Sequence, residues 1–331
     1  MKNKNVLVTG GGGFIASHLT RRLVNLGADV SIITKYKSLI DNVRIADVWD
    51  DINVIEADIR NIDSLNQIKE LKPDIVYHLA AYNHVGHSFI HISECFDVNA
   101  KGTANLIEAC NTCSKFIYTS TSEIYGYQEK VPFEEDFKPQ PISPYSISKY
   151  TGELYARMKN HQNKYPVVIL RPFNNFGPYQ SEKAIIPEII INCLLGKEIK
   201  STEGNQTREF NYIENIIDGF ILAAKEDKAI GEIINLGSGQ DISIKNLILK
   251  IHELTNSRSK LSIGSLEYRP TEIWKMFCEN SKSRNILGWK PNISFEEGLK
   301  KTIKWYKNYI DLYYKKDKGL SKLSSLKVQT D

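Results

Sequence analysis

The chain has 331 residues, 41% of them hydrophobic and 25% charged, values that are typical of a globular protein. The formal net charge of +4, from 43 basic and 39 acidic residues, is too small an excess to indicate a nucleic-acid partner. No apolar run approaches the roughly 20 residues that a membrane-spanning helix needs, and no apolar signal segment follows Met1. We therefore expect a cytoplasmic protein without a membrane partner.

Five cysteines are scattered along the chain. An odd, scattered set is not a disulfide framework. The one C-x-x-C pair, Cys110 and Cys113, has no second pair with which to hold a metal ion. We predict buried, free thiols and no metal site.

The first half of the chain alternates short apolar runs with helical patterns. Runs that are apolar on both faces are typical of parallel strands covered by helices on both sides of a sheet. Right-handed crossovers then give a doubly wound, Rossmann-type α/β fold. The predicted strands are residues 6–8, 30–33, 54–57, 75–79, 115–120 and 167–170, and the predicted helices are 14–26, 62–69, 93–113 and 145–164.

After residue 171 the pattern becomes mixed. We predict a dinucleotide-binding Rossmann domain over residues 1–171, which also carries the catalytic residues. A smaller mixed α/β region over 172–315, interleaved with the first, is predicted to bind the substrate, and residues 316–331 to form a flexible tail. Helices are predicted at 185–195, 215–225, 244–256 and 295–314, and strands within 204–212 and at 232–236.

A glycine-rich turn follows the first strand and opens the first helix, with the sequence Gly10-Gly11-Gly12-Gly13-Phe14-Ile15-Ala16. Gly10 permits a tight turn, Gly13 lets the backbone approach a pyrophosphate, and the small Ala16 lets the helix pack closely on the sheet. The free N–H groups and the dipole of the helix N-terminus favour an anion there. The strand–turn–helix context therefore predicts a dinucleotide site.

The residues after the second and third strands bear on which dinucleotide is bound. NAD enzymes place a carboxylate after the second strand, whereas this chain has Thr34-Lys35-Tyr36-Lys37. Two lysines would tolerate the 2′-phosphate of NADP, so the sequence allows either NAD or NADP as cofactor. Asp58-Ile59, after the third strand, is placed to meet the adenine, although a turn or capping role explains Asp58 nearly as well.

Tyr145 and Lys149 lie four residues apart on one predicted helix face. An ammonium near a phenol lowers the phenol's pKa from about 10, which predicts that Tyr145 is a general base near neutral pH. By itself this spacing is a weak signal, because Tyr and Lys often share a solvated face. A second polar segment, residues 118–126, ends the fifth strand at the sheet edge where open α/β folds bind ligands, and its Glu123 is either a second base or a solvated side chain.

Together these motifs resemble the extended short-chain dehydrogenase/reductase family, and within it the NAD-dependent epimerase/dehydratase branch that acts on nucleotide sugars. The resemblance runs from residue 6 to about residue 306. The motifs that carry it are T-G-x-x-G-F-I at 9–15, His78-Leu79-Ala80-Ala81, Asn99-x-x-Gly102-Thr103, S-T-S-E-x-Y-G at 120–126, Tyr145-x-x-x-Lys149, Arg171-Pro172-Phe173-Asn174-x-Phe176-Gly177-Pro178 and Thr207-Arg208-x-Phe210.

The resemblance implies roles for these residues. Tyr145 would take the proton of the sugar 4-hydroxyl while NAD accepts the C4 hydride, Lys149 would hold the nicotinamide ribose, and Thr121 would hydrogen-bond O4. The substrate would be a nucleotide-diphosphate sugar, and helices 93–113 and 145–164 would form a four-helix bundle in a homodimer. Further cofactor contacts would come from Gly10, Gly13, Phe14, Ile15, Thr34, Lys35, Asp58, Ile59, Leu79, Ala80 and Ala81, and substrate contacts from His84, Ser122, Asn174, Ile186, Arg208, Asn235 and Arg269.

Glu123 separates the reactions that can follow C4 oxidation. In 4,6-dehydratases of this family the corresponding glutamate removes the C5 proton before water leaves C6, whereas plain 4-epimerases commonly lack it. Ser122 stands where many dehydratases have an aspartate acid, although GDP-mannose dehydratases and UDP-glucuronate decarboxylases also carry Thr-Ser-Glu. We predict a 4,6-dehydratase of bacterial surface-glycan synthesis. The alternatives are a 4-dehydrogenase, a 4-epimerase or a decarboxylase, and, more remotely, a non-catalytic NAD(P)-binding regulator.

Overall fold

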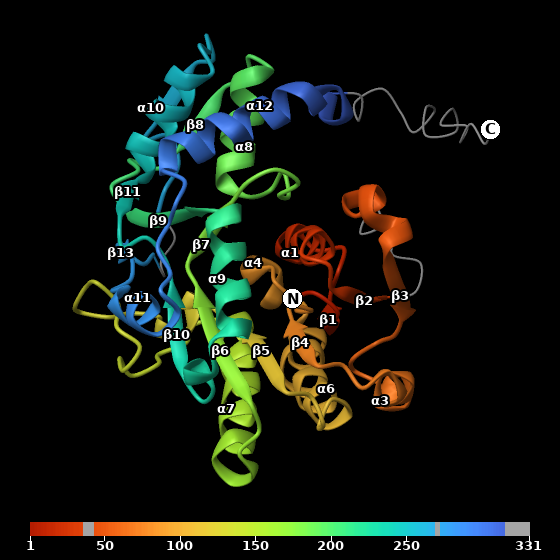
Figure 1. Ribbon diagram of the computed structural model, residues 1–331. Coiled ribbons are helices and arrows are strands. Elements are labelled where there is room, and N and C mark those ends of the chain that lie inside the picture. Colours follow the sequence, from red (N-terminus) through yellow and green to blue (C-terminus); the bar gives the residue numbers. More distant parts are fainter. Residues whose placement is uncertain (36–42, 269–271, 315–331) are drawn as a thin grey trace, which may run out of the picture. The chain divides into compact units, whose positions relative to one another are not determined.

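The computed structural model describes residues 1–35, 43–268 and 272–314 (Figure 1). Lys37, Arg269 and the predicted tail over 316–331 lie outside the described residues. The chain divides into two compact units. Unit 1 comprises Met1–Asn175, Arg208–Asp241 and Lys275–Ile293, and unit 2 comprises the described parts of Phe176–Thr207, Ile242–Trp274 and Ser294–Asp331.

A seven-stranded parallel sheet in the order β10-β6-β5-β4-β1-β2-β3 forms the centre of unit 1. The strand order reverses between β1 and β4, and in open α/β sheets ligands bind beside such a reversal, at the carboxyl ends of the strands. The predicted doubly wound α/β fold is therefore confirmed. The strands are β1 (Asn5–Thr9), β2 (Asp29–Thr34), β3 (Ile52–Glu56), β4 (Ile75–His78), β5 (Lys115–Thr119), β6 (Val167–Pro172) and β10 (Ile233–Leu236).

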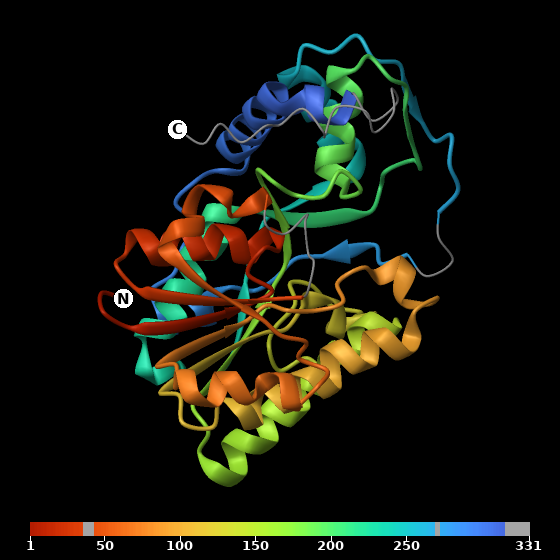
Figure 2. The ribbon, with the colours of Figure 1, turned by 90° about the vertical axis from the view of Figure 1, so that its right-hand side faces the viewer.

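Helices cover both faces of this sheet, which explains why its central strands are apolar on both sides (Figures 1 and 2). Leu7, Val76 and Phe116 belong to a buried cluster with residues of α3, α6 and α7. Tyr77 points to the opposite face, where its ring centroid lies 6.4 Å from that of Phe220 in α9. The covering helices are α1 (Phe14–Asn25) and α9 (Ile213–Lys225) on one face, and α3 (Asn66–Leu71), α6 (Gly102–Ala109) and α7 (Pro144–Asn163) on the other.

The single helix predicted over 93–113 is a continuous run of α5 (Ile92–Phe96), one π-helical turn η3 (Asp97–Lys101) and α6. The wide turn carries Asn99. Its Oδ1 accepts a hydrogen bond from Tyr82 N at 2.8 Å, and its Nδ2 donates to Ser148 Oγ at 2.9 Å. The π-turn therefore lets one side chain tie the segment after β4 to α7, which is typical of π-turns near functional sites.

The remaining elements include several short ones that the sequence pattern did not separate. In unit 2, α12 packs against α8, and β8 pairs in parallel with β12. Unit 1 adds η1 (Ala46–Asp51), η2 (Asp63–Leu65), α4 (Val85–Ser88), η4 (Ser122–Tyr125), η5 (Asp227–Ala229), β13 (Lys275–Met276) and α11 (Ser281–Leu287). The other elements are β7 (Asn174–Phe176), α8 (Ile185–Leu194), β8 (Ile199–Ser201), β9 (Thr207–Tyr212), β11 (Asp241–Ser243), α10 (Ile244–Leu254), β12 (Leu261–Ile263) and α12 (Phe295–Tyr314).

All five cysteines are free and buried, as predicted. Burial raises the pKa of the Cys113 thiol to about 11, which keeps it protonated at neutral pH. Within the described ranges, no three His, Cys, Asp or Glu side chains gather as metal ligands. The helices in those same ranges include none with the length and apolar character to cross a membrane.

Gly152 marks a close approach between α7 and the π-turn. A Cβ at this position would lie 2.6 Å from both Asn99 O and Tyr118 Oη. We predict that Gly152→Ala lowers the free energy of unfolding by about 1–3 kcal/mol, because overpacking exceeds the gain of about 1 kcal/mol in helix propensity. Urea denaturation checks this, with Thr151→Ala on the exposed face of α7 as control. Equal midpoints for the two variants would contradict it.

Candidate active site

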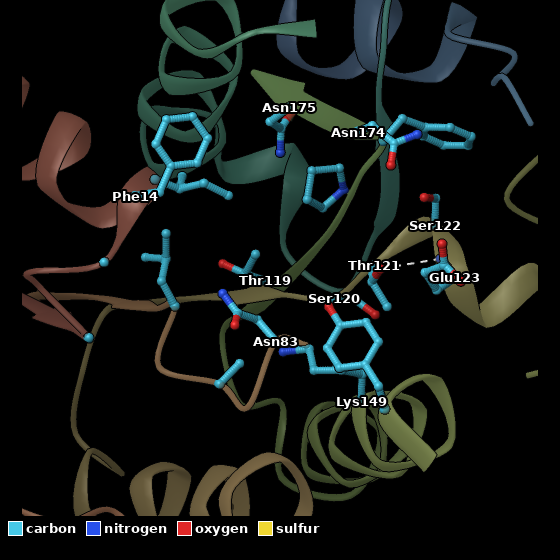
Figure 3. Close-up of a pocket in the computed structure, with 18 of the residues that line it drawn as sticks. Phe14, Asn83, Thr119, Ser120, Thr121, Ser122, Glu123, Lys149, Asn174 and Asn175 are labelled. Atoms are coloured by element: carbon cyan, nitrogen blue, oxygen red, sulfur yellow. Dashed lines mark hydrogen bonds between the residues drawn. The ribbon is translucent and has the colours of Figure 1, made fainter. Parts of the chain in front are cut away.

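A pocket of about 300 Å³ in unit 1 lies at the carboxyl ends of the central strands (Figure 3). Ligand pockets in proteins commonly begin at this volume. Predicted site residues from separate parts of the chain line it together: Gly10, Gly13, Phe14, Ile15, Leu79, Ala81, Thr121, Ser122, Glu123, Tyr145, Lys149 and Asn174. The lining also includes side chains without a predicted role, namely Asn83, Val85, Thr119, Ser120 and Asn175.

The glycine-rich turn is shaped as a dinucleotide site requires. Gly10 has φ +66°, and a Cβ there would lie 3.0 Å from Ala80 Cα. A Cβ on Gly11 would lie 2.5 Å from Ile32 Cβ, so only glycine lets the turn lie this close to β2. Gly13 caps α1 without a side chain, and the first N–H groups of a helix have no intrahelical partner. The helix N-terminus therefore fits a pyrophosphate.

A buried histidine fixes the end of β4 beside this turn. His78 Nδ1 lies 2.8 Å from Thr9 Oγ1, and Nε2 lies 2.9 Å from Thr103 Oγ1. The Thr103 hydroxyl already donates to a backbone carbonyl, so Nε2 carries the ring proton and Thr9 donates to Nδ1. Thr9 Oγ1 in turn accepts from Leu79 N and Ala80 N at 3.1 and 3.0 Å. Burial lowers the pKa of His78 well below its usual value, so the ring is a neutral brace for this wall.

The residues predicted to meet the adenosine half do not line the pocket of Figure 3. Asp58 accepts a hydrogen bond from Arg60 Nη2 at 2.6 Å, and this contact lowers the pKa of the Asp58 carboxyl. The carboxylate therefore binds a residue of the turn in which it lies. Lys35 Nζ lies 3.5 Å from Glu94. Thr34 Oγ1, at the end of β2, is buried and has no hydrogen-bond partner among the described residues. An unpaired buried hydroxyl at this edge fits a polar ligand group.

Several predicted substrate residues lie elsewhere. Asn235 is fully buried, and its Oδ1 accepts from Tyr125 Oη at 2.7 Å. His84 is exposed at the start of α4, where its Nδ1 accepts from His87 N at 3.1 Å. Neither residue is among those that line the pocket. Ile186 lies on α8 of unit 2, Arg208 lies on β9, and Arg269 is outside the described residues.

The start of α7 holds Tyr145 and Lys149 in the pocket wall. Ser143 caps the helix by accepting from Ser146 N at 3.1 Å, and a proline follows the cap. Lys149 is only 2% exposed, and its Nζ lies 4.6 Å from the centroid of the Tyr118 ring. Tyr118 Oη also donates to Lys149 O at 2.7 Å, so a side chain of β5 fixes the backbone of the lysine.

Burial changes the pKa of both members of the pair. It lowers the pKa of Lys149 to about 7, against a carboxylate at Glu153 that raises it. It raises the pKa of Tyr145 to about 12, although a hydrogen bond with Thr121 lowers it, and the Glu123 carboxylate raises it further. The predicted lowering of the phenol's pKa is therefore wrong for the protein alone, because loss of water disfavours the phenolate more than the neighbouring groups favour it.

A buried ion pair, which sequence reasoning missed, joins Glu153, on the same helix as the lysine, to Arg171 on β6. Arg171 and Glu153 are 1% and 0% exposed, and Arg171 Nη2 donates to Glu153 Oε1 at 2.6 Å. Ser120 Oγ donates to Glu153 Oε2 at 2.6 Å, and Arg171 Nη1 donates to Tyr125 Oη at 2.9 Å. One carboxylate thus joins α7, β6 and the polar segment after β5. The sequence feature that could have indicated this role is that Glu153 follows Lys149 by four residues, on the same helix face.

Comparison with known proteins identifies the family. The model of the family described as GDP-mannose 4,6 dehydratase matches residues 7–302. A dTDP-D-glucose 4,6-dehydratase of Bos taurus is 35% identical over 332 residues, covering 96% of this chain and 92% of that protein. The chain belongs to the NAD-dependent epimerase/dehydratase branch of the extended short-chain dehydrogenase/reductase family. The predictions of family and enzyme class are confirmed.

Solved structures of this branch agree. UDP-glucuronic acid 4-epimerase from Bacillus cereus, in complex with UDP-glucuronic acid and NAD, superposes with a TM-score of 0.85 at 31% identity, covering 93% of this chain and 100% of that chain. A dTDP-glucose 4,6-dehydratase from Streptomyces venezuelae with NAD bound gives 0.85 at 27% identity, covering 93% and 98%. These structures of the same branch contain NAD, which confirms the prediction of NAD as cofactor. The glycine turn described above fits NAD.

The charge on Glu153 offers a test of the catalytic pair. As pH rises, the Tyr145–Lys149 pair loses its first proton from Lys149, which leaves a neutral phenol and a neutral amine. The active form, with a phenolate and an ammonium, carries the same number of protons and is a tautomer of that state. Activity should therefore rise with pH to a plateau. We predict that Glu153→Gln moves the rising limb to lower pH and lowers the plateau by about tenfold for each unit by which the pKa of Lys149 falls. The pH dependence of kcat/KM measures both.

Glu153→Asp, which keeps the charge, is the control and should leave the limb near its original pH. If Glu153→Gln lowers turnover without moving the limb, the glutamate stabilises the fold but does not tune Lys149. Leaving Arg171 without its carboxylate also costs stability, so the unfolding midpoint of each variant is measured alongside.

Proposed function

We propose that this chain is a nucleotide-sugar 4,6-dehydratase that oxidises the sugar C4 hydroxyl with NAD bound. The observation that carries the proposal is Glu123. It lines the same pocket as Tyr145 and Thr121, and its charge acts on the Tyr145 phenol. The dehydratases among the relatives support the same reaction. The bacterial surface-glycan setting and the cytoplasmic location remain predictions.

The first step is proton removal from the sugar 4-hydroxyl by Tyr145. Thr121 Oγ1 accepts a hydrogen bond from Glu123 N at 3.2 Å, which leaves its own proton to donate to O4 or to the phenol oxygen. A protonated Lys149 stabilises the phenolate. Bound NAD would accept the hydride from C4 and return it to C6.

Loss of water then depends on Glu123. The C4 ketone acidifies the C5 proton, which Glu123 removes as the C5–C6 double bond forms and the C6–O bond breaks. Ser122 is a poor acid, and its Oγ lies 3.7 Å from Met276 Sδ, so we assign the proton of the departing water to Glu123 itself, newly protonated from C5. When the hydride returns to C6, C5 must regain a proton. The proton that Tyr145 took from O4 supplies it in the overall balance.

A 4-epimerase is the second candidate, since UDP-glucose 4-epimerase from Thermotoga maritima superposes with a TM-score of 0.86 at 28% identity, covering 92% of this chain and 99% of that chain. In that reaction the carboxylate of Glu123 would only accept a hydrogen bond from the sugar. The two candidates differ in whether the product has lost water.

We predict that Glu123→Gln abolishes water loss, by about 10²–10⁴-fold, but spares C4 oxidation, because an amide cannot remove the C5 proton. Purified enzyme is incubated with a panel of GDP-, UDP-, dTDP- and CDP-sugars, and products are analysed by mass spectrometry. Wild type should yield a product lighter by one water, and Glu123→Gln only a reduced cofactor.

Two further variants control this experiment. Glu129→Gln, at an exposed glutamate outside the pocket, should behave as wild type. Tyr145→Phe should lose C4 oxidation itself, which distinguishes an enzyme from a binding module. A wild-type product of unchanged mass with an altered sugar NMR spectrum would replace the dehydratase proposal with the epimerase.

We further propose that the chain forms a homodimer through α7 and the helical run from α5 to α6. Ile147 and Leu154 are seven residues apart on α7 and are 41% and 45% exposed. Phe89 and Ile92, just before and at the start of α5, are 57% and 51% exposed. Apolar side chains gathered on packed helices of one unit favour burial by a second copy.

Leu154→Asp should therefore shift the protein from dimer to monomer, because the variant would bury a charge in the interface. Light scattering coupled to size-exclusion chromatography, over a range of protein concentrations, measures the mass. Leu249→Asp is the matched control, since Leu249 is 43% exposed on α10 of unit 2 and should leave the mass unchanged. Equal masses for both variants would refute this interface.

A further inference from the structure

Thr119, the last residue of β5, has a hydroxyl with no structural partner. The residue is 7% exposed and lines the pocket, and its Oγ1 makes no hydrogen bond to any residue that the structure describes. Buried hydroxyls without a hydrogen bond are costly and uncommon in folded proteins. This hydroxyl is therefore suited to a ligand group.

Strand geometry shows which side of the pocket Thr119 faces. Its neighbours Tyr118 and Ser120 both reach α7, through bonds of 2.7 Å to Lys149 O and 2.6 Å to Glu153 Oε2. Successive strand residues point to opposite faces, so Thr119 points to the face covered by α1 and α9. Figure 3 draws it between Phe14, at the start of α1, and Ser120.

A second unpaired hydroxyl stands on the other side of the glycine turn. Thr34 ends β2, Thr119 ends β5, and β1 and β4 lie between them in the sheet. At the usual strand spacing this separates the two positions by about 14 Å along the sheet edge. A dinucleotide whose pyrophosphate lies at the β1 turn extends one half toward each. Tyr145 and Lys149, to which we assign the proton transfer, lie on α7, and Tyr118 of β5 bonds the backbone there at Lys149 O.

We propose that the Thr119 hydroxyl hydrogen-bonds the nicotinamide-ribose half of the bound dinucleotide and does not contact the sugar substrate. The inference rests on the proposed NAD-dependent function of this pocket. It adds a polar contact from the face opposite to the Tyr145–Lys149 pair, which fixes the nicotinamide half from two sides.

Thr119→Val tests this, because valine keeps the shape and removes only the hydroxyl. Cofactor-free enzyme is titrated calorimetrically with NAD, with nicotinamide mononucleotide and with ADP. Thr119→Val should weaken NAD and the mononucleotide by about five- to tenfold and leave ADP unchanged. The reverse pattern, with ADP weakened, is expected for Thr34→Val. The unfolding midpoint of cofactor-free Thr119→Val should not fall, because no protein hydrogen bond is lost.

Thr20→Val is the matched control. Thr20 Oγ1, on α1, is also buried without a partner among the described residues, but it does not line the pocket. Its loss should leave all three affinities unchanged. Thr119→Ser keeps the hydroxyl and should retain wild-type NAD affinity, which keeps the test decisive if the valine variant folds poorly.

The proposal is overturned if Thr119→Val binds NAD as wild type does, if it weakens ADP as much as the mononucleotide, or if only the KM of the sugar rises. These titrations contain no sugar. A wild-type enzyme that binds NAD but releases no water would therefore refute the dehydratase proposal and leave this one standing.

Discussion

The buried pair of Arg171 and Glu153 is the interaction on which the geometry of the site depends. Two charges with almost no exposure are tolerated only because each is fully paired, and removing one partner of such a pair typically costs about 3–5 kcal/mol. The same carboxylate accepts the Ser120 hydroxyl, and the same guanidinium donates to Tyr125. Helix α7 and the end of β5 are thus held at a fixed spacing, which is the spacing that sets Tyr145 against Thr121.

The burial that gives this rigidity also constrains the chemistry. It lowers the pKa of Lys149 to about 7 and raises that of Tyr145 to about 12, so water exclusion opposes the ionised form of both groups. The Glu153 carboxylate offsets part of this for the lysine. A phenolate at Tyr145 therefore needs further positive charge, which the cationic nicotinamide ring of NAD would supply when bound.

The sequence predicts most of the fold because its strongest signals are local. Strands β1, β4, β5 and β6 are buried on both faces, and α12 shows its period over twenty residues. The π-turn at 97–101 was missed, since the local pattern is helical throughout and the widening accompanies tertiary packing against Gly152. Strand β10 was predicted as a strand, but its partner β6 follows from the tertiary fold, not from its own residues.

The candidate site was predictable where motif and position coincide, as for the glycine turn and Tyr145 with Lys149. The site was not predictable where burial sets the pKa of a side chain or brings two distant residues into contact. Spacing alone predicts an activated phenol, whereas the depth of the pocket raises its pKa. Nor does sequence show that Arg171, near the end of β6, meets Glu153 eighteen residues earlier, because that contact exists only once β6 lies beside α7.

The end of β5 shows how alternation along one strand separates structural hydroxyls from those left for ligands. Tyr118 and Ser120 point toward α7, and their hydroxyls are used in bonds within the protein. Thr119 points to the other face and keeps its hydroxyl unpaired, whereas Thr121 accepts a backbone N–H and retains its proton. A shift of β5 by one residue would exchange these roles, because every side chain would change face. The parallel register that aligns Thr119 with Leu170 of β6 is therefore as necessary to the chemistry as the catalytic side chains.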